Sequence, residues 1–246
     1  MRLGTALPAD ITFDLESNRC PNCRLRKLAC FCESWPLIDS ALKLDILVHE
    51  KELNKESNTA LLIWKSLPNS RMFFWQRKLM ASCTHDDAID VDDINNKGSI
   101  SEPLPVLLFP ARFANRYQGQ DSTSHPMLSL EQLKGRRLLL LDGSWQQVRK
   151  MYRQSKALQF LPCFELPIST DFPMEAFSLR RNQQEGGFCS AQAIALLHWH
   201  MAEKKQAKQM LKAFNQFGRH VAASRNNHAV KTELKHYERN NAKLLS

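Results

Sequence analysis

Short apolar runs separated by longer polar stretches dominate the pattern of the chain, and they predict strands that alternate with helices. The strand-like runs lie at 44–48, 72–75, 106–109 and 138–141, with a less regular one at 163–166. The runs that end at Trp75, Phe109 and Leu141 are almost entirely apolar, as expected for strands covered on both faces. We therefore predict an α/β fold in which helices cover both faces of one sheet.

Two helices are predicted in the second half of the chain. The run at 138–141 leads through a tight turn into helix-like residues 146–155. Residues 190–212 predict the longest helix, because apolar positions recur at close to 3.6-residue spacing and lysines gather at the end, where they suit the helix dipole. Residues 225–246 are polar with scattered apolar positions, and the pattern leaves open whether they form a last helix or a tail.

Composition and charge narrow the class of protein. Of the 246 residues, 43% are hydrophobic and 24% are charged, which is typical of soluble globular proteins. No apolar run approaches the roughly 18 residues of a membrane span, and the N-terminus lacks the pattern of a secretory signal, so we expect no membrane partner and a cytoplasmic location. The net charge of +9 favours a polyanionic partner such as nucleic acid, although a basic protein without one would look the same. No obligatory protein partner is evident.

Four of the seven cysteines lie close together near the N-terminus, and they indicate a metal site. Cys20 and Cys23 form one pair, and Cys30 and Cys32 form a second pair six residues later. Four thiolates are a typical structural zinc shell, while free thiols or two disulfides are the alternatives. A closed four-cysteine shell leaves no position for a substrate, so this zinc would be architectural. Basic residues around the ligands leave open whether this knuckle touches RNA phosphates.

Polar residues follow the strand-like run at 138–141, where an α/β sheet binds its ligands. Asp142, Ser144 and Trp145 would lie just outside the carboxyl end of that strand. The alternative is purely structural, with Ser144 as the cap of the next helix and Trp145 as a core residue. The residues alone do not decide between these two interpretations.

The stretch Asp142-Gly143-Ser144-Trp145 resembles the D-x-T-W signature of the DTW-domain family. Four other stretches match that family in the same order: the cysteines at 20–32, residues 49–59 with Ser57-Asn58-Thr59, the strand end at 107–110, and residues 179–193. Together they cover roughly residues 19–200.

The sequence departs from the family pattern at four positions. Ser144 and Ser190 stand where threonine is usual, and each keeps a hydroxyl. Ala60 replaces the usual glycine. Gln192 replaces the usual glutamate, which argues against a catalytic role for this position.

The resemblance implies a SPOUT-like sheet with a knotted cofactor site. It also implies an enzyme that binds S-adenosylmethionine and transfers its 3-amino-3-carboxypropyl group to N3 of a tRNA uridine, releasing methylthioadenosine. The bacterial branch of the family acts at position 47 in the variable loop of tRNA. The expected partner is therefore tRNA.

The resemblance and the position at strand ends also suggest roles for individual residues. Asp142 is the expected catalytic carboxylate, either as the base for the N3 proton or as the group that orients uracil or the amine of the donor. Arg180 would bind the donor carboxylate or an RNA phosphate, unless it is a surface arginine. The other residues expected around the donor are Asn58, Thr59, Phe109, Pro110, Gly143, Ser144, Trp145, Ser190 and Gln192. The residues expected to contact RNA are Arg136, Arg149, Lys150, Arg153 and the lysines of 204–212.

Pattern and resemblance together divide the chain into four parts. We expect a flexible N-terminus at 1–18, a zinc-binding knuckle at 19–36, a DTW (SPOUT-like) catalytic domain at 37–224 and a C-terminal helix or tail at 225–246. Two other functions remain open, an RNA methyltransferase that uses the same donor and a non-catalytic zinc-ribbon protein that binds nucleic acid.

Overall fold

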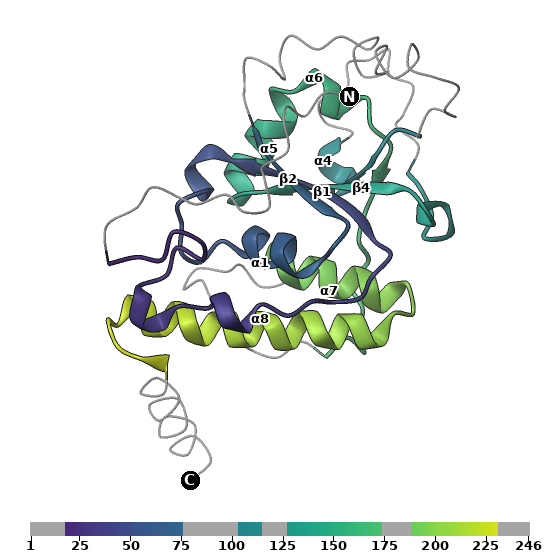
Figure 1. The fold of residues 1–246 in the computed structure, drawn as a ribbon. Helices are drawn as coiled ribbons and strands as arrows, with labels where there is room; N and C mark the ends of the chain where they lie inside the picture. The colour runs from purple at the N-terminus through teal and green to yellow at the C-terminus, as the bar shows by residue number, and fades with distance from the viewer. Residues whose placement is uncertain (1–17, 76–102, 115–126, 174–187, 231–246) are drawn as a thin grey trace, which may run out of the picture.

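A parallel sheet forms the centre of the computed structural model, which describes residues 18–75, 103–114, 127–173 and 188–230. Within these residues the strand order is β2-β1-β4-β3-β5, and every neighbouring pair is parallel (Figure 1). The strands are β1 (Lys43–His49), β2 (Ser70–Trp75), β3 (Val106–Leu108), β4 (Arg137–Asp142) and β5 (Cys163–Phe164). All five predicted strands are confirmed, and β5 is shorter than predicted.

Helices cover both faces of the sheet, as the apolar strands predict. One face carries α1 (Thr59–Ser66), α7 (Ser190–His200) and α8 (Lys204–Arg225) (Figure 1). The other face carries α4 (Ala111–Ala114), α5 (Trp145–Arg153) and α6 (Lys156–Gln159). Short 3-10 helices complete the described elements: η1 (Lys27–Ala29), η2 (Cys32–Ser34), η3 (Glu50–Glu52) and η6 (Glu131–Leu133).

The two-residue period of β4 divides its side chains between two cores. Leu138 and Leu140 pack into the core shared with α1, α7 and α8, whereas Leu139 and Leu141 pack into the core shared with α5 and α6. This arrangement explains why the run shows no alternation of apolar and polar residues. It also directs the next residue, Asp142, toward the face of α1 and α7.

The single helix predicted over 190–212 is wrong, because two helices occupy this region. α7 ends at His200, and α8 begins at Lys204 after a turn in which Ala202 has a positive φ of 61°. The amide of Glu203 donates to the carbonyl of His198 (2.9 Å), and the amide of Ala202 donates to that of Trp199 (3.2 Å), which is the Schellman pattern of a helix end. Alanine rather than glycine occupies the left-handed position, so the sequence carried no stop signal.

Residues of the cysteine-rich segment pack directly on α8. The ring of Phe31 lies 5.4 Å from that of Phe217 and 4.8 Å from that of His220. The amide of Arg26 donates to Ser224 Oγ (3.0 Å), and His220 Nδ1 lies 3.1 Å from the carbonyl oxygen of Ala29. These contacts attach the knuckle to the main core.

The predictions of a knot and of the two chain ends concern residues that the structure does not describe. The predicted knot stays a prediction, and residues 174–187, between β5 and α7, lie outside the description. Residues 1–17 and 231–246 lie outside it as well, and α8 ends at Arg225. In the part of the chain that the structure describes, none of the helices combines the length and the apolar composition that a membrane span needs.

A buried carboxylate joins three neighbouring strands at their amino-terminal half. Asp45 on β1 accepts two hydrogen bonds of 2.8 Å from Arg71 on β2 and one of 3.1 Å from Arg137 on β4. Because asparagine removes the negative charge and one of the two acceptor oxygens that the arginines share, Asp45→Asn should lower the free energy of unfolding by about 2–3 kcal/mol. Urea denaturation would measure this loss. The exposed Asp39→Asn is the matched control, and an equal effect of both variants would contradict the assignment.

Candidate functional site

The candidate site lies where the carboxyl ends of β1 and β4 meet. These strands are neighbours, and the chain leaves β1 toward α1 on one face and β4 toward α5 on the other (Figure 1). Such a divergence is the topological switch point, where open α/β sheets bind their ligands. β4 ends with Asp142 and β1 ends with His49.

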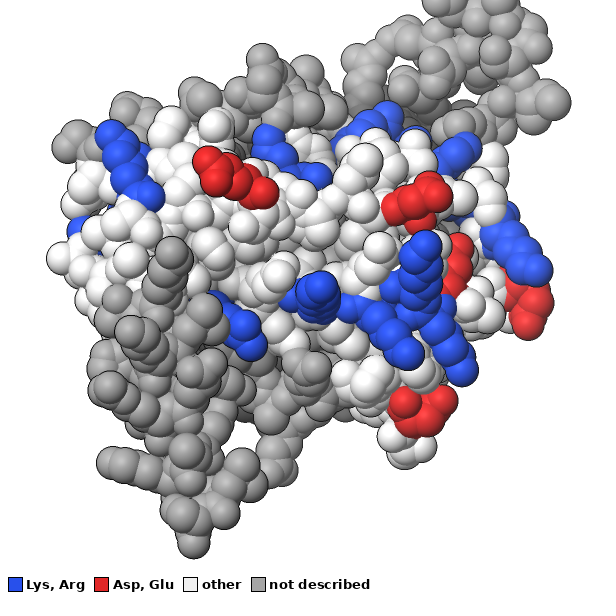
Figure 2. All heavy atoms as spheres, turned by 60° about the horizontal axis from the view of Figure 1, so that its bottom comes forward, with Lys and Arg blue, Asp and Glu red and all other residues white. Residues whose placement is uncertain are grey.

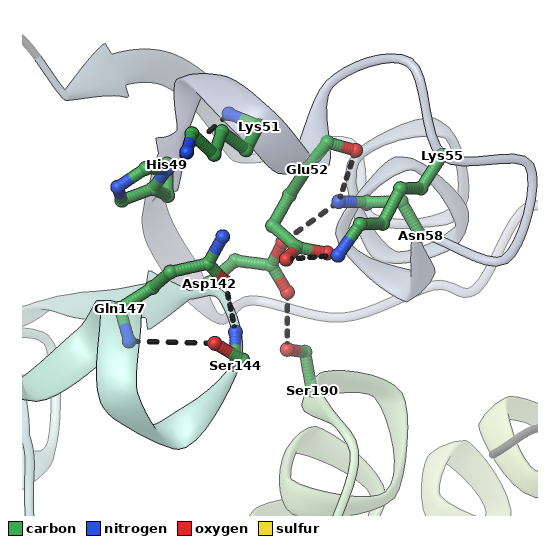
Figure 3. Close-up of polar contacts among 9 residues, drawn as sticks. All are labelled: His49, Lys51, Glu52, Lys55, Asn58, Asp142, Ser144, Gln147 and Ser190. Carbon is green, nitrogen blue, oxygen red and sulfur yellow. Dashed lines mark hydrogen bonds and ion pairs between the residues drawn. The ribbon is translucent and has the colours of Figure 1, made fainter. Parts of the chain in front are cut away.

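Asp142 is a buried carboxylate held between two helices, with 4% of its surface exposed. Its Oδ2 accepts from Asn58 Nδ2 (2.8 Å), and its Oδ1 accepts from Ser190 Oγ (2.5 Å) (Figure 3). Asn58 caps α1 and Ser190 begins α7, so two helix N-termini converge on one carboxylate. The positive ends of both helix dipoles favour its ionised form.

Asn58 is fixed by the helix that it caps. Its Oδ1 accepts from the amide of Leu61 (3.1 Å), while Nδ2 donates to Asp142 and to the main-chain oxygen of Glu52 (3.2 Å). One side chain therefore ends the loop after β1, begins α1 and reaches β4. Thr59, the next predicted site residue, is buried at the first position of α1.

The turn after Asp142 bears out one half of the structural interpretation and contradicts the other. Ser144 caps α5, since its hydroxyl accepts from the amide of Gln147 (3.4 Å) and its own amide donates to Gln147 Oε1 (2.5 Å). Trp145 is not a core residue, because 41% of its surface is exposed. At Gly143 a Cβ atom would lie 3.1 Å from the Cβ of Gln147, so this close approach favours glycine.

An aromatic group lies beside this turn. The ring of Trp145 lies 6.0 Å from that of the buried Phe109 and 4.7 Å from that of Phe113, which it meets edge to face. Phe109 also stacks on Tyr152 of α5 at 4.5 Å. The predicted neighbours Phe109 and Trp145 are thus brought together, with Pro110 following β3.

Gln192 has a structural role at the start of α7. Its Oε1 accepts from the amide of Cys189 (3.1 Å), the reciprocal bond of a capping box. Glutamate could accept the same bond, so glutamine keeps this function. Arg180 lies outside the described residues, and its predicted role remains a prediction.

His49 is a site residue that the sequence analysis did not select. Its Nδ1 accepts from the amide of Lys51 (3.2 Å), and its ring stacks on Trp75 at 5.3 Å. Burial is the main cause that lowers the pKa of His49, so the neutral imidazole with its proton on Nε2 is favoured. Its place at a strand end, at the start of the family-like stretch 49–59, was the available signal.

Glu52 is a second buried carboxylate that the sequence analysis did not select. None of its surface is exposed, and its Oε1 forms an ion pair of 2.6 Å with Lys55 Nζ (Figure 3). Because it follows β1 in a loop, no periodicity could show that its side chain turns inward.

Two of the basic residues beside the cysteines, Arg19 and Arg24, are engaged within the fold. Arg24 has a positive φ of 68° and is only 1% exposed, so it faces the core. Burial lowers the pKa of Arg24 to about 10, although the negative charges of Asp142 and Cys23 oppose this shift, and the guanidinium stays protonated near neutral pH. Arg19 is bound to Glu56 (2.8 Å).

The four cysteines form a cluster that fits a structural zinc ion. Their sulfur atoms all lie within 4.8 Å of one another, with 3.5 Å between Cys20 and Cys32 and 3.6 Å between Cys23 and Cys30. Thiolates at the zinc–sulfur distance of about 2.3 Å would lie roughly 3.8 Å apart in a tetrahedron. The amide of Phe31 also donates to Cys23 Sγ (3.5 Å), as expected of a metal-bound sulfur.

Without a metal, the thiols of this cluster differ in acidity. Burial raises the pKa of Cys20, but hydrogen bonds from the amides of Cys23 and Asn22 outweigh it and lower the pKa to about 7. Burial raises the pKa of Cys23 to about 12. Metal binding must therefore release protons from the more buried thiols.

The predicted RNA-binding residues lie in three separate places: on α5, before the start of β4 and on α8. Arg149, Lys150 and Arg153 line a hollow with Gln146 on α5, which begins at the site. Arg136 directly precedes β4, at the amino-terminal end of the strands, where it donates to the carbonyl of Leu104 (2.6 Å). The lysines at the start of α8 gather on another face (Figure 2): Lys204, Lys205, Lys208 and Lys212. They follow α7, which carries the chain about 16 Å away from Asp142.

The zinc assignment predicts that the protein loses its metal when one cysteine of the cluster is replaced. Cys23→Ser should abolish stoichiometric zinc, measured by mass spectrometry of the metal in purified protein, and should destabilise the packing on α8. Cys163→Ser, a buried cysteine outside the cluster, should keep the metal. A full equivalent of zinc in Cys23→Ser would disprove the assignment.

Comparison with known proteins agrees with the motifs of the site. The DTW domain family model matches residues 17–222. Among curated proteins, "tRNA-uridine aminocarboxypropyltransferase 2" of Drosophila melanogaster is 25% identical over 146 residues, which are 58% of this chain and 52% of the relative. The chain thus spans about half the length of this relative, and no solved structure matches it. Because the family model covers most of the chain, including the knuckle, β4 and α7, the protein belongs to the DTW domain family.

Proposed function

We propose that the protein is a tRNA-modifying transferase that moves the 3-amino-3-carboxypropyl group of S-adenosylmethionine to N3 of a tRNA uridine. The observation that carries this proposal is the buried Asp142, which lies at the switch point inside the family signature and is held by Asn58 and Ser190. The name of the Drosophila relative supports the same reaction. A position in the variable loop, a knotted cofactor site and a cytoplasmic location belong to the proposal.

The reaction requires one bond to form and one to break. N3 of uracil attacks the terminal carbon of the aminocarboxypropyl group, and the bond from that carbon to the sulfonium breaks, leaving neutral methylthioadenosine. The N3 proton must leave, and Asp142 is the carboxylate that accepts it or that orients the reacting groups. Because sulfonium is a good leaving group, alignment of nitrogen and carbon supplies much of the catalysis.

The surroundings of Asp142 suggest where the donor lies. Phe109, Pro110 and the turn from Gly143 to Trp145 would frame its nucleoside, since they combine aromatic surface with main-chain polar groups. Asn58, Thr59 and Ser190 supply polar contacts, and Gln192 supports the start of α7. Zinc, held by the four cysteines, would stabilise the knuckle and take no part in the transfer.

The reaction is tested by incubating the purified protein with S-adenosylmethionine and unmodified tRNA. Mass spectrometry should detect aminocarboxypropyluridine and methylthioadenosine in equal amounts. S-adenosylhomocysteine would instead indicate a methyltransferase, and tRNA binding without either product would indicate a non-catalytic binder.

The role of Asp142 is tested in the same reaction. Asp142→Asn keeps the shape of the side chain and removes its charge, so transfer should fall by at least about 100-fold, the usual contribution of a general base, while the affinity for tRNA stays within about twofold. Product formation at the wild-type rate would exclude Asp142 from the mechanism.

RNA binding is proposed for the hollow on α5, because it adjoins the turn after Asp142. Replacing Arg149, Lys150 and Arg153 with glutamine should weaken tRNA binding and reduce the slope of log affinity against log salt by about 0.7–0.9 for each lost phosphate contact. The matched triple variant changes Lys204, Lys205 and Lys208 on α8. If only the α8 variant loses affinity, the α5 assignment is wrong.

A further inference from the structure

The loop between β1 and α1 carries an ion pair that the proposed chemistry does not yet use. Glu52 is fully buried, whereas Lys55, whose Nζ lies 2.6 Å from Glu52 Oε1, has 49% of its side chain exposed. Burying an ionised carboxylate costs several kcal/mol, and an exposed pair would stabilise the fold with less desolvation. Buried charges that cost folding free energy in this way are expected at functional sites.

This ion pair is connected to Asp142 through a single side chain. Asn58 Nδ2 donates both to Asp142 Oδ2 (2.8 Å) and to the main-chain oxygen of Glu52 (3.2 Å), so the loop and the strand end share one nitrogen (Figure 3). The Glu52 carboxylate, in turn, holds the amine of Lys55 at the outer side of the loop. The position of Lys55 is therefore fixed relative to Asp142.

Sheet face and exposure separate Lys55 from two other nitrogen-bearing side chains near the site. Asp142 continues the positions of Leu138 and Leu140 and faces α1, as does the loop that carries Lys55. His49 continues the position of Leu47 and faces α5 instead. Arg24 is 1% exposed, whereas half of the Lys55 side chain is open to an incoming ligand.

Binding of the aminocarboxypropyl group requires a positive charge close to Asp142. Its reacting carbon lies only about 2.5 Å from the carbon that bears the ammonium and the carboxylate, because one methylene separates them. If Asp142 lies at the reacting atoms, the groups that bind this zwitterion must lie within a side-chain length of Asp142. A lysine ammonium is a suitable partner for the carboxylate.

We propose that Lys55, positioned by Glu52, binds the carboxylate of the aminocarboxypropyl group, so that the loop between β1 and α1 is the subsite for the zwitterionic end of the donor. This inference rests on the proposed function. It makes Lys55 a specificity-determining residue and Glu52 a positioning residue.

The test compares two donors that differ only in the carboxylate. Calorimetric titration of the full-length protein would use S-adenosylmethionine and decarboxylated S-adenosylmethionine, which keeps the sulfonium and the amine. Lys55→Gln should weaken binding of S-adenosylmethionine about tenfold and leave binding of the decarboxylated donor unchanged, because one charge-assisted contact is lost. Glu52→Gln should change the same ratio in the same direction. Lys51→Gln, an exposed lysine of the same loop, should change neither affinity.

The outcomes separate the inference from the proposed function. An equal loss for both donors in Lys55→Gln would show a structural role and overturn the inference, as would a selective loss in Arg180→Gln with none in Lys55→Gln. If the wild-type protein transfers the aminocarboxypropyl group but binds both donors equally, only the inference fails. If it binds neither donor and makes no product, the proposed function fails with it.

Discussion

The burial of one carboxylate at the end of β4 organises the site. An ionised side chain that is almost excluded from water needs hydrogen bonds and positive potential to offset its desolvation. Asp142 obtains the hydrogen bonds from Asn58 and Ser190, and it obtains positive potential from the ends of α1 and α7 and from the buried charge of Arg24. The carboxylate of Asp142 thus requires three elements that are far apart in sequence: the knuckle, the loop after β1 and α7.

The cysteine-rich segment contributes to this balance in a way that its metal site alone does not suggest. Cys23 and Arg24 are consecutive, so a metal that fixes the sulfur of one also fixes the backbone from which the guanidinium of the other enters the core. The positive φ of Arg24 turns its side chain inward at this point. Since the segment also packs on Phe217 and His220, the cysteine cluster, α8 and the charge of Arg24 near Asp142 form one unit.

What the sequence could predict follows from where the controlling interactions lie. The strands were predictable because a parallel strand covered on both faces requires an apolar run, and the clustering of the four cysteines was predictable because the spacing of metal ligands is local. The break between α7 and α8 was not predictable, because Ala202 takes a left-handed conformation that the contacts of Glu203 with His198 stabilise. Glu52 was missed for a similar reason, since the burial of a loop side chain depends on elements that only the fold brings near. Lys55 was missed with it, because only the buried carboxylate of Glu52 distinguishes this lysine from other exposed ones.

Three of the four departures of this chain from the family pattern fall on residues whose structural role tolerates them. A serine hydroxyl at position 144 caps α5 as threonine would, and the serine at position 190 still donates to Asp142. Glutamine at position 192 accepts the bond that a capping box needs, which either amide or carboxylate oxygen can do. Each of these three substitutions keeps the hydrogen bond and changes only a methyl group or a charge. The helix starts that hold Asp142 are therefore formed without a negative charge at position 192.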